Sequence, residues 1–185
     1  MPNLTDFTLR RLEKSDLSTI LKWRNSDRIK DNMYTDHIIS WEEHQLWHKK
    51  IVKSMKNVFL VFEYKCISTG LVYFTDIDNY NGTCFWGFYM GDFYGPKGSG
   101  IIMGYLGIEY AINHLNIRKL CGETFAFNIK GEKFHEKLGF QKEGYFKKQV
   151  FKKGQYQDII RFGLFDNEWQ EYKVCLKKEM ISICQ

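Results

Sequence analysis

The chain has 185 residues, 44% of them hydrophobic and 26% charged, with a formal net charge of +5. This length supports one domain rather than two, and the absence of a run of about 18 apolar residues excludes a membrane-spanning helix. The basic residues are spread along the chain, so the charge suits an acidic small molecule better than nucleic acid.

The first residues carry neither the basic nor the apolar segment of a signal peptide. The five cysteines show no CxxC spacing, which gives a metal site little support. We therefore expect a cytoplasmic protein, a monomer or homodimer, that binds no metal, no nucleic acid and no membrane.

The first third of the chain predicts a strand, a helix, a loop and a second helix. Residues 7–10 alternate like a strand, and a helix capped near Ser15 or Asp16 extends through Trp23. Residues 24–39 are polar and irregular, which predicts a loop.

The second helix is expected to begin at Ser40, which forms a capping-box pattern with Glu43. Trp47, Ile51 and Met55 follow at i+4 steps, so the pattern predicts that they share one apolar face.

Three strands are expected next, at residues 58–64, 71–76 and 83–90. The turn-forming segments 68–70 and 79–82 separate them. Because these links are short, we expect an antiparallel meander.

The chain after residue 90 completes a β-α-β-α order and ends in a hairpin. The predicted fold is therefore of the mixed α+β class. We expect a single domain over residues 1–165 and a helical tail over 166–185. The expected elements are a helix at 101–115, a strand at 120–127, a helix at 131–137, and a hairpin of 140–151 with 156–165.

The segment from Phe88 to Ile101 gives the strongest indication of a ligand-binding site. A strand ends, the turn Gly95-Pro96-Lys97-Gly98-Ser99-Gly100 follows, and a long helix begins. Glycines let the backbone approach a ligand, and the first N–H groups of a helix have no partners within it, so this segment can hold a pyrophosphate. A tight connection that binds nothing is the alternative. The segment matches neither the P-loop nor the dinucleotide-binding pattern.

This turn resembles the Gln/Arg-x-x-Gly-x-Gly/Ala coenzyme A loop of the Gcn5-related N-acetyltransferases (GNATs), with Gly95 replacing the usual Gln or Arg. Further along, Asn128-x6-His135-Glu136-Lys137-Leu138-Gly139-Phe140 is similar to the family motif Asn-x6-Tyr-Glu-Lys-Leu-Gly-Phe. The resemblance spans about residues 7–164. It implies a largely antiparallel central sheet flanked by helices, and transfer of acetyl from acetyl-CoA to an amine.

The resemblance also implies where acetyl-CoA lies. The strand with Phe88, Tyr89 and Met90 is expected to splay from its neighbour, so that its backbone pairs with the pantetheine arm like an added strand. Residues Gly95 to Ile101 form the pyrophosphate loop, with N–H donors from Lys97 onward. Asn128 bonds the cofactor arm.

His135 stands where the family often has a tyrosine that protonates the departing thiolate. A neutral imidazole carries one N–H and an imidazolium carries two, so His135 is the catalytic candidate. A surface histidine on a short helix is the alternative.

The N-terminal third resembles one branch of the family, through Trp23-Arg24-Asn25-Ser26, Asn32-Met33-Tyr34-Thr35, Ile38-x-x-Trp41-Glu42-x-His44-x-x-Trp47 and Gly70-x4-Thr75. That branch acetylates the 4-amino group of UDP-4-amino-4,6-dideoxy-N-acetyl-β-L-altrosamine in pseudaminic acid biosynthesis. The resemblance implies a UDP-amino sugar as the acceptor.

The residue types are consistent with such an acceptor, because an arginine can fork onto a diphosphate and aromatic rings can cover uracil. Trp47 and His44 also suit a packed helix face, whereas Arg24 and Tyr34 fall in a polar segment where packing explains less. The predicted acceptor residues are Arg24, Met33, Tyr34, His44, Trp47 and Thr75.

Two alternatives remain open at this point. An acetyltransferase acting on protein N-termini, as the ribosomal-protein branch does, shares the early Trp-Arg region and the cofactor loop. A non-catalytic acyl-CoA-binding module is a rival of another class, with His135 marking the loss of the acid. No carboxylate stands out as the general base; Asp76 and Asp78 are expected to be solvated turn residues.

Overall fold

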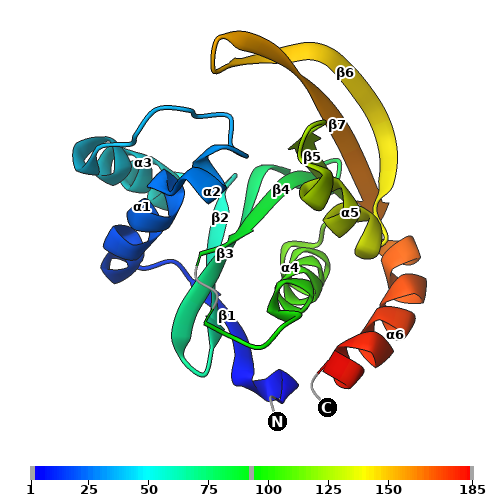
Figure 1. The fold of residues 1–185 in the computed structure, drawn as a ribbon. Helices are drawn as coiled ribbons and strands as arrows, with labels where there is room; N and C mark the ends of the chain where they lie inside the picture. The colour runs from blue at the N-terminus through cyan, green and yellow to red at the C-terminus, as the bar shows by residue number, and fades with distance from the viewer. Residues whose placement is uncertain (1–2, 92–93, 184–185) are drawn as a thin grey trace.

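A computed structural model describes residues 3–91 and 94–183 (Figure 1). Its centre is a seven-stranded sheet of order β1-β2-β3-β4-β5-β7-β6, whose described strands pair antiparallel except for β4 with β5. The expected α+β fold and its β2-β3-β4 meander are confirmed. The strands are β1 (Phe7–Arg11), β2 (Val58–Tyr64), β3 (Ile67–Asp78), β4 (Thr83–Met90), β5 (Lys119–Phe125), β6 (Gln141–Lys152) and β7 (Gln155–Phe165).

Helices cover both faces of this sheet (Figure 1). Three helices lie against one face and three against the other, so the meander is buried between two layers. The first face carries α1 (Leu17–Asn25), α2 (Asp27–Lys30) and α3 (Trp41–Lys53), and the second carries α4 (Ser99–Leu115), α5 (Ile129–Lys137) and α6 (Asp166–Ile183).

The main hydrophobic core lies on the α4 face. Successive strand residues point to opposite faces, so Phe62, Val72 and Trp86 meet α4 there. Trp169 and Met180 of α6 belong to the same core and are 0% and 1% exposed. The helix predicted as a tail is therefore packed into the main core.

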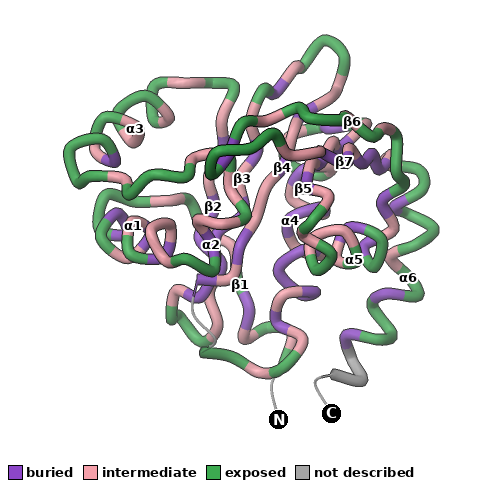
Figure 2. Tube along the Cα trace, turned by 45° about the horizontal axis from the view of Figure 1, so that its top comes forward, coloured by how far each residue is buried: buried purple, intermediate pink, exposed green. Residues whose placement is uncertain are grey.

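The α1 face carries a smaller core, in which Ile20 and Trp23 pack against Leu71 and Tyr89. The helix α3 contributes little to it, because His44 is the one buried residue among its described positions. Figure 2 shows α3 as exposed or half-buried over most of its length. The prediction that Met55 lies on an apolar helical face is wrong, since α3 ends at Lys53 and Met55 is 92% exposed.

Two further local predictions are wrong. The expected turn at 68–70 lies inside β3, and the hairpin turn is formed instead by Lys65 and Cys66, whose φ angles are 50° and 61°. Two residues with positive φ give the chain the twist that a two-residue hairpin needs. The expected loop 24–39 contains α2, and Arg24 lies in the last turn of α1.

Ser40 caps α3 as predicted, and its hydroxyl accepts a hydrogen bond from the Glu43 N–H at 3.1 Å. The reciprocal half of the capping box does not form, because the Glu43 carboxylate lies 3.0 Å from the Nε2 atom of His37.

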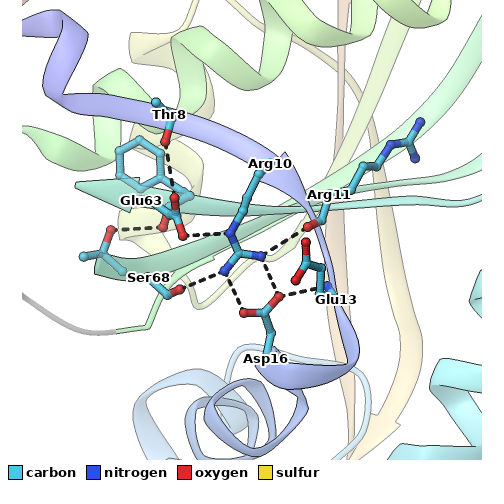
Figure 3. A network of polar contacts seen from close by, with 9 residues as sticks. Thr8, Arg10, Arg11, Glu13, Asp16, Glu63 and Ser68 are labelled. Atoms are coloured by element: carbon cyan, nitrogen blue, oxygen red, sulfur yellow. Dashed lines mark hydrogen bonds and ion pairs between the residues drawn. The ribbon is translucent and has the colours of Figure 1, made fainter. Parts of the chain in front are cut away.

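A polar network around Arg10 joins β1 to the start of α1 and to β2 (Figure 3). The guanidinium donates to both carboxylate oxygens of Asp16 at 2.7 Å, and to Glu63 at 2.7 Å. Burial opposes ionisation of Asp16, but the bonds from Arg10 and from the Glu13 N–H outweigh it and lower the pKa of that carboxyl. The network therefore fixes where the first strand ends and the first helix begins.

Candidate active site

The glycine-rich turn leads into α4 through a left-handed residue. Gly98 is the N-cap, with φ of 95°, a conformation that only glycine adopts without strain. The N–H groups of Ser99 and Ile101 donate to the carbonyls of Pro96 and Gly98 at 3.2 and 2.9 Å. Residues 92 and 93, between the strand and this turn, lie outside the described residues.

The strands β4 and β5 diverge where the cofactor arm was predicted. They pair through four residues each, ending at Trp86 opposite Gly122, so the following part of β4 has no partner on its β5 side. A cavity of about 690 Å³ opens there. Phe88, Tyr89, Met90 and Asn128 of the predicted cofactor residues line it together with the catalytic candidate His135. The predicted turn residues Gly95 to Ile101 are not among its lining residues.

Asn128 is the N-cap of α5 and uses its side-chain oxygen within the protein. Oδ1 accepts a hydrogen bond from the Gly131 N–H at 3.0 Å. The remainder of this side chain faces the cavity, and Gly131 also lines it.

His135 is buried, with 3% of its surface exposed. Its Nδ1 atom lies 2.8 Å from the Gly131 carbonyl oxygen, and its ring stacks on Phe162 with centroids 4.6 Å apart. Because a carbonyl only accepts, Nδ1 carries the hydrogen and Nε2 of the neutral ring carries a lone pair. Burial lowers the pKa of His135 to about 4, and Nε2 has no hydrogen-bond partner among the described residues.

A second cavity, of about 310 Å³, adjoins the first one on the α1 face. Both are lined by Met33, Tyr73, Thr75 and Tyr89, so the two cavities lie side by side. Five of the six predicted acceptor residues line the second cavity, and Tyr34 lines the first: the five are Arg24, Met33, His44, Trp47 and Thr75.

Arg24 brings an uncompensated positive charge into this second cavity. Its Nη1 atom is buried and has no hydrogen-bond partner among the described residues. Burial lowers the pKa of the guanidinium, and the hydroxyls of Tyr89 and Tyr73 only partly offset this effect. The Nε2 atom of His44 is likewise buried and unpaired. Burying polar groups without partners is costly, so these atoms point to a ligand.

Aromatic rings form the walls around these two polar groups. Trp47 stacks on His44 at 4.9 Å and meets Phe59 edge-on at 5.1 Å, and Phe59 stacks on Tyr73 at 5.4 Å. Tyr73 lies directly over Gly87 of β4, where an added Cβ would come within 2.1 Å of its Cζ. The ring row therefore ends at the residue where β4 leaves β5.

Tyr34 closes the other side of the site. Its hydroxyl hydrogen-bonds to Glu123 of β5, and its ring meets Phe125 edge-on at 5.5 Å. Burial and the bond to Glu123 raise the pKa of Tyr34, which stays a neutral phenol. Glu123 also accepts from Nε of Arg161 at 2.9 Å.

Sequence reasoning missed Tyr73 and Glu123. Both lie in strands, where alternation accounts for their presence without any role in a site. A signal for Tyr73 exists in Gly87, because a glycine inside a strand often marks a close approach by another group.

Among the described residues, no group of three or more His, Cys, Asp or Glu side chains is placed to hold a metal ion. None of the helices in the described part of the chain is both long and apolar enough to cross a membrane.

Comparison with known proteins gives a consistent result. Residues 9–160 match the sequence profile of the Acetyltransferase (GNAT) domain family. The SPbeta prophage-derived uncharacterized N-acetyltransferase YokL of Bacillus subtilis is 30% identical over 149 residues, 80% of each chain. The acetyltransferase PseH of Campylobacter jejuni is 28% identical over 179 residues, 96% of this chain and 95% of that one.

The spermidine N(1)-acetyltransferase of Vibrio cholerae is 24% identical over 166 residues, 89% of this chain and 96% of that one. Its crystal structure in complex with CoA and spermine superposes with a TM-score of 0.83, covering 90% of this chain and 99% of that one at 22% identity. The fold of this chain is therefore the one that carries CoA in that enzyme.

Proposed function

This chain belongs to the GNAT acetyltransferase family, and we propose that it moves acetyl from acetyl-CoA to the amino group of a UDP-linked amino sugar. The acceptor we propose is UDP-4-amino-4,6-dideoxy-N-acetyl-β-L-altrosamine, or a close relative, in pseudaminic acid biosynthesis. The observation that carries the proposal is the buried Nη1 atom of Arg24, which has no hydrogen-bond partner among the described residues and lies in the aromatic-walled second cavity.

The donor side of the site fits acetyl-CoA, which supplies an acyl group activated as a thioester. The β4 edge beyond Trp86 has no β5 partner, so its backbone groups can pair with an extended pantetheine arm. The left-handed Gly98 and the N-terminus of the 17-residue α4 suit a pyrophosphate, with Lys97 beside them. We assign Phe88, Tyr89, Met90, Asn128 and the turn from Gly95 to Ile101 to this role.

The acceptor side fits an anion joined to flat and apolar groups. Arg24 offers a buried donor that a diphosphate can satisfy, and Nε2 of His44 offers a second polar contact. Trp47, Phe59 and Tyr73 give ring surface beside them. Met33, Tyr34 and Thr75 continue from this cavity to the cleft between β4 and β5, where the amine must meet the thioester.

The reacting amine must be neutral to attack. An amine on a sugar ring is less basic than a lysine side chain, so a weak or water-relayed base is sufficient. Backbone N–H groups of β4 beyond Trp86 are suited to bind the developing oxyanion.

His135 remains the candidate for proton transfer to the thiolate. The Gly131 carbonyl holds the Nδ1–H, and Nε2 of the neutral ring carries only a lone pair, so His135 can protonate the thiolate only as the imidazolium. With a pKa of about 4, about one ring in a thousand has that form at pH 7. We predict that His135→Ala lowers kcat and leaves acetyl-CoA affinity intact, whereas His135→Tyr keeps a proton donor. Equal kcat in the wild type and both variants contradicts the acid role.

A polyamine is the second candidate acceptor, because Glu43, Asp76 and Glu123 also line the two cavities. Two of these carboxylates already contact cationic or polar partners, Glu43 with His37 at 3.0 Å and Glu123 with Arg161 at 2.9 Å. The half-buried Arg24 repels a polycation, which is the reason to prefer the anionic acceptor.

The decisive experiment mixes purified protein and acetyl-CoA with three acceptors: a UDP-4-amino-4,6-dideoxy sugar, spermidine and a peptide with a free N-terminus. Thiol release is followed, and the product is identified by mass. We expect the nucleotide sugar to give the highest kcat/KM. Faster turnover of spermidine or the peptide overturns the proposed acceptor, and no turnover with any amine favours an acyl-CoA-binding module.

A further inference from the structure

The tip of the β6–β7 hairpin carries a buried lysine. Lys152 is 2% exposed, although it lies at the end of β6, a strand that is exposed over most of its length (Figure 2). Lysine is almost never buried to this degree without partners, because its ammonium group is strongly hydrated. Its partners should therefore reveal what the burial achieves.

Those partners are backbone carbonyls of the segment that follows α2. The Nζ atom of Lys152 donates to the carbonyl of Met33 at 2.7 Å and to that of Lys30 at 3.2 Å. These residues lie more than a hundred positions earlier in the chain. Figure 1 shows the hairpin reaching back toward this segment. A charged donor on two carbonyls is a strong contact that also satisfies both oxygens.

The same segment, residues 31–39, is here called the acceptor loop, because Met33, Tyr34 and Thr35 line the site. Its far end is held by Asn25, whose side chain bonds both the N–H and the carbonyl of Ile39 at 2.9 Å. Its near end is held by the hairpin. The acceptor loop is therefore held at both of its ends, by Asn25 and by the β6–β7 hairpin.

Lys152 also reaches the ring that supports Tyr34. Its Nζ lies 5.7 Å from the centroid of Phe125, within range of a cation–π contact, and Phe125 meets Tyr34 edge-on. A single ammonium therefore contacts the backbone of Met33 and the aromatic support of the next residue.

We propose that Lys152 is a positioning residue that fixes the acceptor loop, so that Met33 and Tyr34 stand at the junction of the two cavities. Lys152 does not touch the reacting atoms; it sets the affinity for the acceptor through the loop. This inference rests on the proposed function only in taking residues 31–39 as part of the acceptor site.

The neighbouring Lys153 is the matched control. It contacts the same loop, with its Nζ 2.7 Å from Asp31 and its N–H bonded to Asp36 at 3.2 Å. Its side chain is 56% exposed, so its ion pair is screened by water and contributes little. Lys153→Met removes a lysine at the same hairpin tip without removing the buried contact.

The test compares Lys152→Met with Lys153→Met by hydrogen exchange and by kinetics. We expect Lys152→Met to speed amide exchange in residues 31–36 at least tenfold and to raise the acceptor KM about tenfold. The kcat and the Kd for acetyl-CoA should stay within about threefold, and Lys153→Met should resemble the wild type. Unchanged exchange and unchanged KM in Lys152→Met overturn the proposal, as do equal effects of both variants.

Exchange needs no substrate, so it distinguishes failure of this inference from failure of the proposed acceptor. KM is measured with whichever amine turns over. If Lys152→Met does not fold, hydrogen exchange of the wild type supplies the test. If Lys152 holds the acceptor loop to the hairpin, the amides of the loop and those of residues 150–155 should become exposed to exchange together. Equal protection of the two segments supports the proposal, and independent opening of the loop contradicts it.

Discussion

Two arginines near the N-terminus differ in their partners, and the proposed function assigns one to stability and the other to binding. Arg10 lies among Asp16, Glu63 and Ser68, and its guanidinium is engaged on every side (Figure 3). Arg24, on the first full helix, has a buried Nη1 atom without a hydrogen-bond partner among the described residues. A buried charge with fixed partners holds elements together, whereas one without them is left for a ligand.

The pKa values of the two guanidiniums shift in opposite directions, in agreement with their different partners. Hydrogen bonds that Arg10 donates to Asp16 raise the pKa of Arg10 above its ordinary value, and Glu63 adds to that effect. Burial lowers the pKa of Arg24, and no carboxylate of the described residues contributes to its shift. The charge on Arg10 is therefore stabilised by the folded protein itself, whereas burial destabilises the charge on Arg24.

The largest expected effect is on the Arg10 network. Arg10→Met removes the cationic partner of the buried Asp16 and the half-buried Glu63, and should lower the free energy of unfolding by about 3 to 4 kcal/mol. Denaturant titration measures this, with Arg11→Met, the exposed neighbour, as control. If kcat/KM for the acceptor falls in folded protein while stability is unchanged, the division between the two arginines is wrong.

Acid should destabilise the protein through its two buried histidines, His44 and His135. His135 has a folded pKa of about 4 against about 6.5 when unfolded, so the unfolded chain binds more protons between these values. Stability is full above pH 6.5 and falls as pH drops toward 4, by about 3 kcal/mol from this residue; burial of His44 acts in the same direction. Denaturant titrations between pH 7 and 4.5 should give a shallower slope in His135→Phe, and an unchanged slope contradicts the assignment.

Arg24→Met should act on binding instead of folding. Loss of the donor should raise the KM for the nucleotide sugar about 30-fold, about 2 kcal/mol, while the free energy of unfolding stays level or rises because a buried charge is removed. Steady-state kinetics and denaturant titration are run side by side. Lys22→Met, on an exposed position of the same helix, is the control for the loss of a positive charge. If Arg24→Met destabilises the protein and leaves KM unchanged, Arg24 has a structural role like that of Arg10.

The smallest effect separates charge from hydrogen bonding in the Arg10 network. Glu63→Gln keeps an acceptor for the Nε–H of Arg10 and removes the negative charge, so we expect a loss of about 1 kcal/mol in the free energy of unfolding. Denaturant titration at low and at 1 M salt checks this. A loss as large as that of Arg10→Met means that the charge of Glu63 alone holds the network.

Several parts of the molecule were predictable because their causes lie close together in the chain. Strand alternation, the cap on α3 by Ser40 and the Gly98 turn depend on residues within a few positions of each other. The motif with Asn128 and His135 is of the same kind, and it places both residues at one cavity. The turn after β2 was mispredicted because tertiary pairing extended β3 through a segment whose composition favours a turn.

The acceptor site depends on contacts between residues far apart in the chain. The sequence alone determined the α+β fold, the family and the residue types that an anionic acceptor requires. Only the tertiary structure decided that the Nη1 atom of Arg24 has no partner among the described residues, that Tyr73 lies over Gly87, and that Lys152 reaches the carbonyl of Met33. The physical reason is that strand register and helix packing set which distant groups are buried together, and local patterns carry no record of that pairing.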